Sequence, residues 1–197
     1  MAFRSVLDGL GPPRLSTLVR HERIPMNESI HQFEPQAHRT QVVELWHRVF
    51  GHAAAHNAPH FAIDKKLAVG DGLFFVAEAG RKVVGSIMAG YDGHRGWIYS
   101  LAVLPEHRRR GLGSRLMQHA EERLKLLGCP KINLQIIQGN EAVEAFYLKL
   151  GYQTEQRISM GKKILENITS AESGRRPERA PCQFERQRRA AIGELKC

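Results

Sequence analysis

The chain has 197 residues, of which 42% are hydrophobic, and its 29 Lys and Arg against 20 Asp and Glu give a formal net charge of +9. This length and apolar content suffice for one domain with a buried core. No apolar stretch is long enough to cross a bilayer, which excludes a membrane-spanning protein.

Hydrophobic periodicity predicts the secondary-structure elements in chain order. They are a short strand at 30–33, a helix over 37–51, a short helix near 61–70, three strands within 73–104, a helix over 112–127, a strand over 131–137, a helix over 141–151, and one or two strands within 152–164. The buried stripe of the long helix is predicted to be Leu112, Leu116, Ala120, Leu124 and Leu127. This order of elements favours a mixed α/β sheet.

Composition divides the chain into three parts. Residues 1–29 are predicted to be a peripheral extension, residues 30–166 the folded domain, and residues 167–197 a basic, disordered tail that is poor in apolar residues. The start of the chain lacks the unbroken apolar block of a secretory signal. The cysteines are odd in number and widely spaced, which is typical of a reducing compartment, so we predict a cytoplasmic protein.

The basic charge raises the question of a nucleic-acid partner. The tail over 167–197 carries +3 and residues 1–25 carry +2, which leaves +4 for residues 26–166. A moderately basic domain suits an anionic small molecule at least as well as a polynucleotide. We therefore disfavour nucleic acid, although the arginine-rich tail keeps a nucleic-acid-associated protein open as an alternative.

The stretch "RRRGLGSRLM" lies between a predicted strand and the long helix. The first N–H groups of a helix lack partners inside the helix, and together with the helix dipole they attract phosphate oxygens. Gly111 and Gly113 open the way to the backbone, while Arg108, Arg109 and Arg110 add positive charge. The stretch predicts a diphosphate cradle, and it has neither the Gly-Lys-Ser/Thr of a P-loop nor a Rossmann glycine pattern.

The segment "LAVLPEHRRRGLGSRLM" resembles the acetyl-CoA-binding motif of the GNAT superfamily of N-acetyltransferases, Arg/Gln-x-x-Gly-x-Gly/Ala after a strand ending in Val-x-Pro. The segment "NEAVEAFYLKLGY" resembles the second signature of that superfamily, and "AGYDGHRGWIYSLAV" is similar to a bacterial subgroup of it. The resemblance covers roughly residues 30–165. It implies the GNAT acyl-CoA N-acyltransferase fold, an α/β fold whose central sheet is mixed and mostly antiparallel, flanked by helices, with strands 4 and 5 splayed apart.

The resemblance also implies how acetyl-CoA is bound as a co-substrate. Backbone groups of Leu101, Ala102 and Val103 would pair with the pantetheine amides, and a backbone N–H there would stabilise the oxyanion. Residues 109–114 would hold the diphosphate. The implied coenzyme-binding set is Leu101, Ala102, Val103, Arg108, Arg109, Arg110, Gly111, Leu112, Gly113, Ser114, Asn140 and Tyr147.

Tyr147 is the predicted general acid, because acyl transfer to an amine expels a thiolate that a nearby phenol can protonate. Asn140 is predicted to cap the helix beginning near Glu141, to bind the coenzyme, or both. The general base stays open. Some relatives have a Glu on the strand before the Asn, but here that position is Gln135, so Glu78, Asp92, His94, Glu106 and water all remain candidates.

Asp92-Gly93 is a hairpin-turn signal, and Tyr91, Asp92, His94 and Arg95 are candidates for contacts with the acceptor. We predict no metal site. His52, His56 and His60 recur every four residues, but Pro59 interrupts a helix there and no carboxylate or thiol accompanies them.

The predicted function is N-acetyl transfer from acetyl-CoA to a primary amine by direct attack in a ternary complex. The alternative is a regulatory or interaction module that binds acyl-CoA with little turnover. The acceptor, a small molecule or a protein amine, is not identified by the sequence. A homodimer is also left open, since dimers are common in the superfamily.

Overall fold

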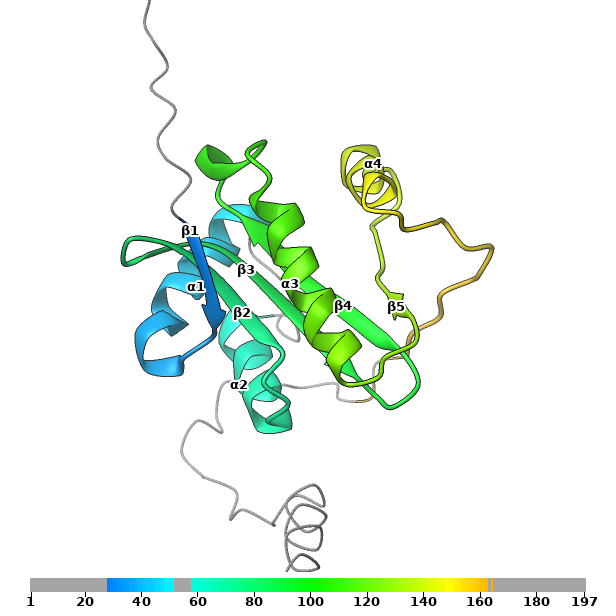
Figure 1. Ribbon diagram of the computed structural model, residues 1–197, viewed down its shortest axis with the longest axis horizontal. Helices are drawn as coiled ribbons and strands as arrows, with labels where there is room; N and C mark the ends of the chain where they lie inside the picture. The colour runs from blue at the N-terminus through cyan, green and yellow to red at the C-terminus, as the bar shows by residue number, and fades with distance from the viewer. Residues whose placement is uncertain (1–27, 52–57, 163, 165–197) are drawn as a thin grey trace, which may run out of the picture. The chain divides into compact units, whose positions relative to one another are not determined.

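Five strands form one sheet in the order β1-β2-β3-β4-β5 (Figure 1). The strands are β1 (Glu28–Gln32), β2 (Phe74–Ala79), β3 (Lys82–Tyr91), β4 (Gly96–Val103) and β5 (Ile132–Asn133). The first four pair antiparallel with their neighbours, and β5 pairs parallel to β4. The prediction of a mixed, mostly antiparallel sheet is therefore confirmed.

The computed structural model describes residues 28–51, 58–162 and 164, which form two compact units. The first unit contains residues 28–49 and 69–135, and it includes the whole sheet. The second contains residues 50–51, 58–68, 136–162 and 164. The predicted tail over 167–197 lies outside the described residues, as does the predicted extension except Glu28 and Ser29, which belong to β1.

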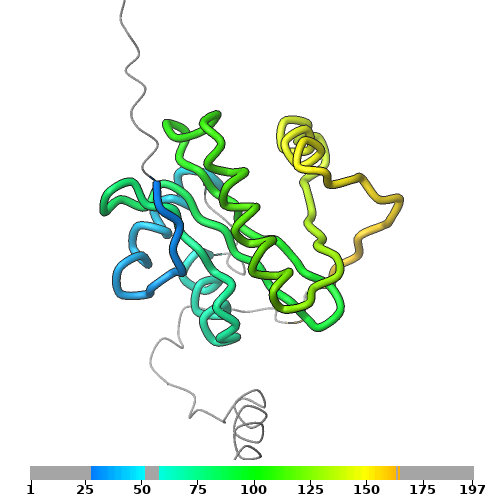
Figure 2. Tube along the Cα trace, viewed as in Figure 1, coloured from blue at the N-terminus to red at the C-terminus, as the bar shows by residue number. Residues whose placement is uncertain are grey.

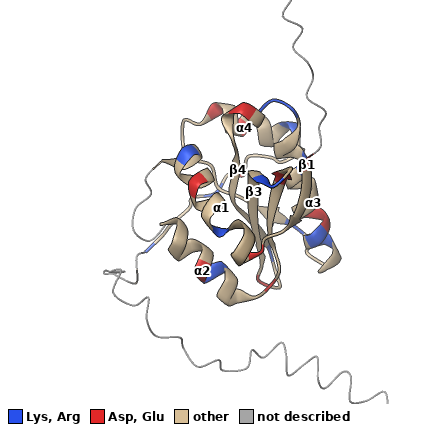
Figure 3. Ribbon diagram, turned by 90° about the vertical axis from the view of Figure 1, so that its left-hand side faces the viewer, with Lys and Arg blue, Asp and Glu red and all other residues tan. Residues whose placement is uncertain are grey.

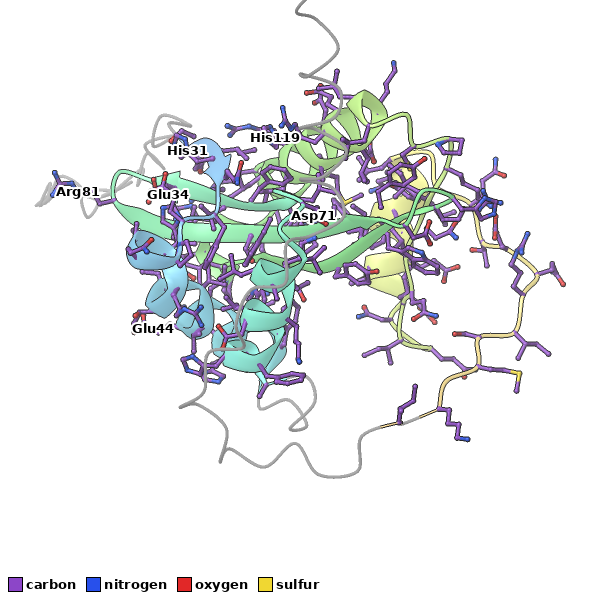
Figure 4. The ribbon with its side chains drawn as sticks, turned by 90° about the horizontal axis from the view of Figure 1, so that it is seen from below. His31, Glu34, Glu44, Asp71, Arg81 and His119 are labelled. Atoms are coloured by element: carbon purple, nitrogen blue, oxygen red, sulfur yellow. The ribbon has the colours of Figure 1, made fainter. Side chains whose placement is uncertain are left out.

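Helices α1 (Pro35–Phe50) and α3 (Leu112–Leu126) cover opposite faces of the sheet. Successive residues of a strand point to opposite faces. Gly85 and Ser86 are consecutive residues of β3, so they face opposite sides of the sheet. The buried hydroxyl of Ser86 accepts a 2.8 Å hydrogen bond from the indole of Trp46 on α1. A Cβ on Gly85 would instead lie 3.0 Å from Leu116 of α3. Figure 4 shows the same arrangement, with His119 of α3 on one side of the sheet and Glu44 of α1 on the other.

The buried stripe of α3 differs from the prediction at its end. Leu112, Leu116, Ala120 and Leu124 are buried as expected, together with Met117, but Leu127 is 52% exposed. The helix stops at Leu126, and the Leu127 N–H bonds to the Leu124 carbonyl in a tighter turn. Leu127 therefore leaves the helical period before it can face the sheet.

Acidic and basic positions lie close together along the exposed side of α3 (Figure 3).

Strand β5 is much shorter than the predicted strand over 131–137. Only Gly96 with Ile132 and Trp97 with Asn133 pair between β4 and β5, and residues 134–137 continue without strand structure. A bulge interrupts β4 just beyond this point, where the register shifts between Ser86 and Met88 and Ser100 takes a φ of 48°. Strands 4 and 5 therefore separate, as the resemblance implied.

In the second unit, α2 (Pro59–Val69) and α4 (Glu141–Lys149) lie close to their predicted positions. The segment Gly151-Tyr152 follows α4, and Gly151 has the positive φ of 89° that a helix-ending glycine tolerates. The predicted final strands are absent: residues 152–162 form no strand in the described part of the chain, and Ile158 and Met160 are each 92% exposed.

The buried Trp46–Ser86 hydrogen bond gives a test of the packing between α1 and the sheet. Ser86→Ala removes the hydroxyl that accepts the hydrogen bond of the indole N–H in a dry environment, so we expect the free energy of unfolding to fall by about 1–2 kcal/mol in urea titrations. Thr40→Ala, on an exposed position of α1, should change it by less than about 0.5 kcal/mol. Equal effects of the two substitutions would contradict this packing.

Candidate functional site

A short turn and loop join the end of β4 to α3 (Figure 2). The turn is the 3-10 helix η2 (Pro105–His107), and residues 108–111 follow it. Arg109 has a φ of 62° and Gly111, the N-cap residue of α3, a φ of 83°. Such left-handed conformations turn successive N–H groups of a loop toward a common side, where they form anion-binding concavities.

The backbone N–H groups of this loop are available to a ligand. The first helical hydrogen bond at this end of α3 runs from the Arg115 N–H to the Gly111 carbonyl, and Gly111 offers no side-chain cap. Within the described part of the chain, no acceptor takes the N–H groups of residues 109–114. A Cβ on Gly111 would meet nothing within 4 Å. These residues fit a diphosphate group, since N–H donors and a helix N-terminus converge on an open space.

The edge of β4 beside this loop is open as well. In an antiparallel pair, the residues whose N–H and C=O face the partner strand alternate with residues whose groups face away. The Leu104 N–H bonds to the Val84 carbonyl at 2.9 Å, and Ala102 pairs with Ser86. Val103 therefore turns its backbone groups toward the edge that β5 has left, whereas Leu101 lies in the bulge, where this alternation is interrupted.

The three arginines have different surroundings. The Arg108 Nε donates a 2.9 Å hydrogen bond to the Val103 carbonyl, on the open edge of β4. Arg109 and Arg110 are exposed, and among the described residues neither side chain has a hydrogen bond or an ion pair. The sequence predicted the same role for all three, and the structure separates one from the other two.

The four residues predicted to contact the acceptor amine form the hairpin between β3 and β4. Asp92 Oδ1 accepts the N–H groups of His94 at 2.7 Å and Arg95 at 2.6 Å. The N–H groups of Arg95 and His94, in that order of effect, hold the pKa of the Asp92 carboxyl below its usual value. The Tyr91 hydroxyl donates to the Gly93 carbonyl, and an Arg95 Nη donates to the His94 carbonyl. The turn signal thus accounts for Asp92.

Tyr147 and Asn140 belong to the second unit. Tyr147 is 8% exposed, its ring packs edge-on against Phe146 and Tyr152, and burial raises its pKa to about 12. The phenol is therefore fully protonated at neutral pH. Asn140 caps α4, since its side chain accepts the Val143 N–H. The predicted helix cap is confirmed.

The sequence pattern of the Acetyltransferase (GNAT) family matches residues 28–152. This chain belongs to that family. The predicted fold and the predicted enzyme class, an acetyltransferase, are thereby confirmed.

Similar proteins agree with this assignment. An acetyltransferase of Pectobacterium atrosepticum is 42% identical over 126 residues, which are 64% of this chain and 89% of that protein. An acetyltransferase of Yersinia pseudotuberculosis is 43% identical over 109 residues, or 55% of this chain and 77% of that protein.

Two solved structures share the fold. The PaiA N-acetyltransferase of Thermoplasma acidophilum in complex with coenzyme A is 18% identical, with a TM-score of 0.56 over 68% of this chain and 94% of that one. The AAC(6')-Iy enzyme in complex with a bisubstrate analogue is also 18% identical, with a TM-score of 0.54 over 69% of this chain and 97% of that one.

Sequence reasoning missed a set of ion pairs around the η2 turn of this GNAT chain. Glu28 of β1 is buried, and Arg115 of α3 binds both its carboxylate, at 3.1 Å, and its carbonyl oxygen. His107 Nδ1 lies 3.5 Å from the same carboxylate. Arg48 of α1 forms a two-pronged ion pair with Glu106, both distances being 3.1 Å. The partners are far apart in sequence, so no local pattern could reveal them.

The carboxylates named as candidate bases have partners in the fold. A hydrogen bond from its own backbone N–H, and then the Arg48 guanidinium, lower the pKa of Glu106. Glu78 lies between His38, at 3.5 Å, and His31, at 3.9 Å; Figure 4 labels His31. His38 Nδ1 accepts the Glu34 N–H, so its other ring nitrogen carries the proton that faces Glu78. Lowered pKa values make Asp92 and Glu106 weak proton acceptors.

The histidines weighed as metal ligands lie mostly outside the described residues, which include only His60. In the ranges described, no three His, Cys, Asp or Glu side chains are grouped so that they could hold a metal ion. The helices in those ranges also include none with the length and apolar character needed to span a membrane.

The raised pKa of Tyr147 can be measured by tyrosinate absorbance. The difference between the titration curves of the native protein and Tyr147→Phe should show one phenol that ionises near 12 instead of 10.0. Because the folded state holds this proton more tightly than the unfolded chain, its stabilising effect is complete below about pH 10 and disappears as the pH rises toward about 12. A difference curve centred near 10 would show that Tyr147 is solvated.

Proposed function

We propose that this protein transfers the acetyl group of acetyl-CoA to a primary amine, by direct attack within a ternary complex. The observation that carries the proposal is the junction of two features in the first unit. The open edge of β4 at Val103 leads, through one short turn, to the loop whose N–H groups have no acceptor in the described chain.

The two features match the two chemically different halves of the coenzyme. The pantetheine arm carries amides, which can pair with the outward-facing peptide groups of Val103 and with those of Leu101 in the bulge. The diphosphate carries negative charge, which suits the N–H groups of residues 109–114 and the side chains of Arg109 and Arg110. The coenzyme A complex of the Thermoplasma relative, which shares the fold, supports this assignment.

The proposed reaction is a single displacement. The lone pair of the amine attacks the thioester carbonyl carbon, a peptide N–H at the β4 edge stabilises the oxyanion, and the carbon–sulfur bond then breaks. The phenol of Tyr147 gives its proton to the departing thiolate, and the proton lost by the new amide nitrogen passes to water. The tyrosinate then regains a proton from water. No covalent acetyl-enzyme forms. Tyr147 carries its proton at physiological pH, as an acid must, and its burial makes the phenol a weaker acid than an exposed tyrosine.

Water is the proposed proton acceptor because the described carboxylates are poorly suited to that role. The pKa values of Asp92 and Glu106 are lowered, and Glu78 is engaged with two histidines. An amine that reaches the site in its neutral form needs no strong base. The cytoplasmic location and the role of Asn140 in binding the coenzyme stay predictions of the sequence, and a homodimer stays open.

The proposal is tested by calorimetry with coenzyme A and by thiol release from acetyl-CoA in the presence of a panel of amines. The panel should contain a protein N-terminus, a lysine peptide, a polyamine, an aminoglycoside and an amino acid. We expect saturable binding of coenzyme A and amine-dependent thiol release with at least one acceptor. Binding without release for any amine would favour the non-catalytic acyl-CoA module, and no binding would refute the proposal.

The acid assignment is tested with Tyr147→Phe and the acceptor found by the panel. Loss of the proton donor should lower kcat by about 100-fold, while KM for acetyl-CoA changes by less than about threefold. Tyr152→Phe, which changes the neighbouring ring in the same way, is the matched control and should retain kcat. An unchanged kcat in Tyr147→Phe would eliminate the phenol as the acid.

A further inference from the structure

We propose that Arg108 is a positioning residue that holds the Val103 peptide at the open edge of β4, and that Arg109 and Arg110 alone supply side-chain charge to the diphosphate. The inference rests on the proposed function, since it assigns parts of the acetyl-CoA site. It divides three adjacent cations of one sequence into two roles.

The first step is the geometry of the Arg108 side chain. Its Nε lies 2.9 Å from the Val103 carbonyl oxygen, which faces the edge that β5 has left. The bond closes a ring around the η2 turn, because the backbone N–H of the same residue donates to the Pro105 carbonyl at 3.2 Å. An arginine in this arrangement supports the strand edge from the side on which the pantetheine arm would lie.

The second step is that the turn itself is anchored on both sides of the sheet. Glu106 is bound by Arg48 of α1, and His107 faces the Glu28 carboxylate of β1, which Arg115 of α3 also holds. Three consecutive residues, 106 to 108, are therefore directed toward three different elements. The turn that carries Arg108 is thus held by contacts to α1, β1 and α3.

The third step is the contrast with the next two residues. Arg109 and Arg110 are exposed and, in the described ranges, their side chains contact no acceptor and no acid. The positive φ of Arg109 marks the point where the chain turns toward the start of α3. These two guanidinium groups are available to an anion, whereas that of Arg108 is engaged through Nε.

Loss of the Arg108 hydrogen bond leaves the Val103 carbonyl without a protein donor and loosens the turn. Pairing of an uncharged pantetheine arm with the same peptide edge should weaken as a result. If the Arg108 side chain only bound phosphate, the results would differ. Its replacement would then weaken binding of the charged half of the coenzyme alone and would reduce the salt dependence of binding.

The two roles are separated by matched substitutions at one position. In glutamine, Nε2 is the same number of bonds from Cα as Nε is in arginine, so Arg108→Gln keeps a donor at that point without the charge. Lysine has a carbon there, so Arg108→Lys keeps the charge and loses the donor. Arg109→Ala and Arg110→Ala report the effect of removing a free cation, and thermal unfolding checks that each variant folds.

The experiment measures binding of three probes to the full chain, namely coenzyme A, pantetheine and adenosine 5′-diphosphate, at two or more salt concentrations. We expect Arg108→Lys to weaken coenzyme A and pantetheine by about 5–10-fold each and to leave the nucleotide unchanged. Arg108→Gln should bind pantetheine as the native protein does and keep the native salt dependence. Arg109→Ala and Arg110→Ala should weaken the nucleotide and flatten the salt dependence.

The inference is overturned if Arg108→Gln weakens the nucleotide with a flatter salt dependence while Arg108→Lys binds all probes normally. It is equally overturned if neither Arg108 variant changes pantetheine binding. Failure of the proposed function looks different, because the native protein itself would then bind neither coenzyme A nor its fragments.

Discussion

The early separation of β4 from β5 is the constraint on which the candidate site depends. The two strands pair only at Gly96 and Trp97, and this pairing requires a residue without a side chain. A Cβ on Gly96 would lie 2.8 Å from the Cys129 sulfur and 3.2 Å from both Ile132 and Leu124. Beyond this contact, the bulge at Ser100 turns β4 away. Peptide groups on this edge of β4 beyond Trp97 thus have no partner in β5.

A buried-charge network holds the loop that completes the site. Glu28 is the most buried acid of this network, and a buried carboxylate is stable only when cations and N–H donors surround it. Arg115 provides both functions by binding its side chain and its backbone carbonyl. Because Arg115 lies in the first turn of α3, the same contact ties the helix N-terminus to β1. The start of α3, which follows the loop, is therefore tied to β1 at the other edge of the sheet from β5.

Much of the fold could be predicted from the sequence because its signals are local. The hairpin turn at Asp92-Gly93, the apolar face of α3 and the cap of α4 each depend on residues within a few positions of one another. The errors share a cause as well. Leu127 and the strand predicted over 131–137 continue a hydrophobic period past the point where the chain turns, and the final strands were predicted from residues that find no partner strand in the described ranges.

The sequence by itself determined the family and the segment that we assign to the phosphates, because glycines and arginines before a helix have a direct local meaning. Only the tertiary structure separated Arg108, which binds the Val103 carbonyl, from Arg109 and Arg110. Whether a guanidinium meets a carbonyl or open solvent depends on strands and helices brought together from distant parts of the chain. The motif admits arginine or glutamine at the position of Arg108, and both side chains carry a nitrogen donor the same number of bonds from Cα. The structural reason for this shared donor is visible only when the Val103 carbonyl is seen beside it.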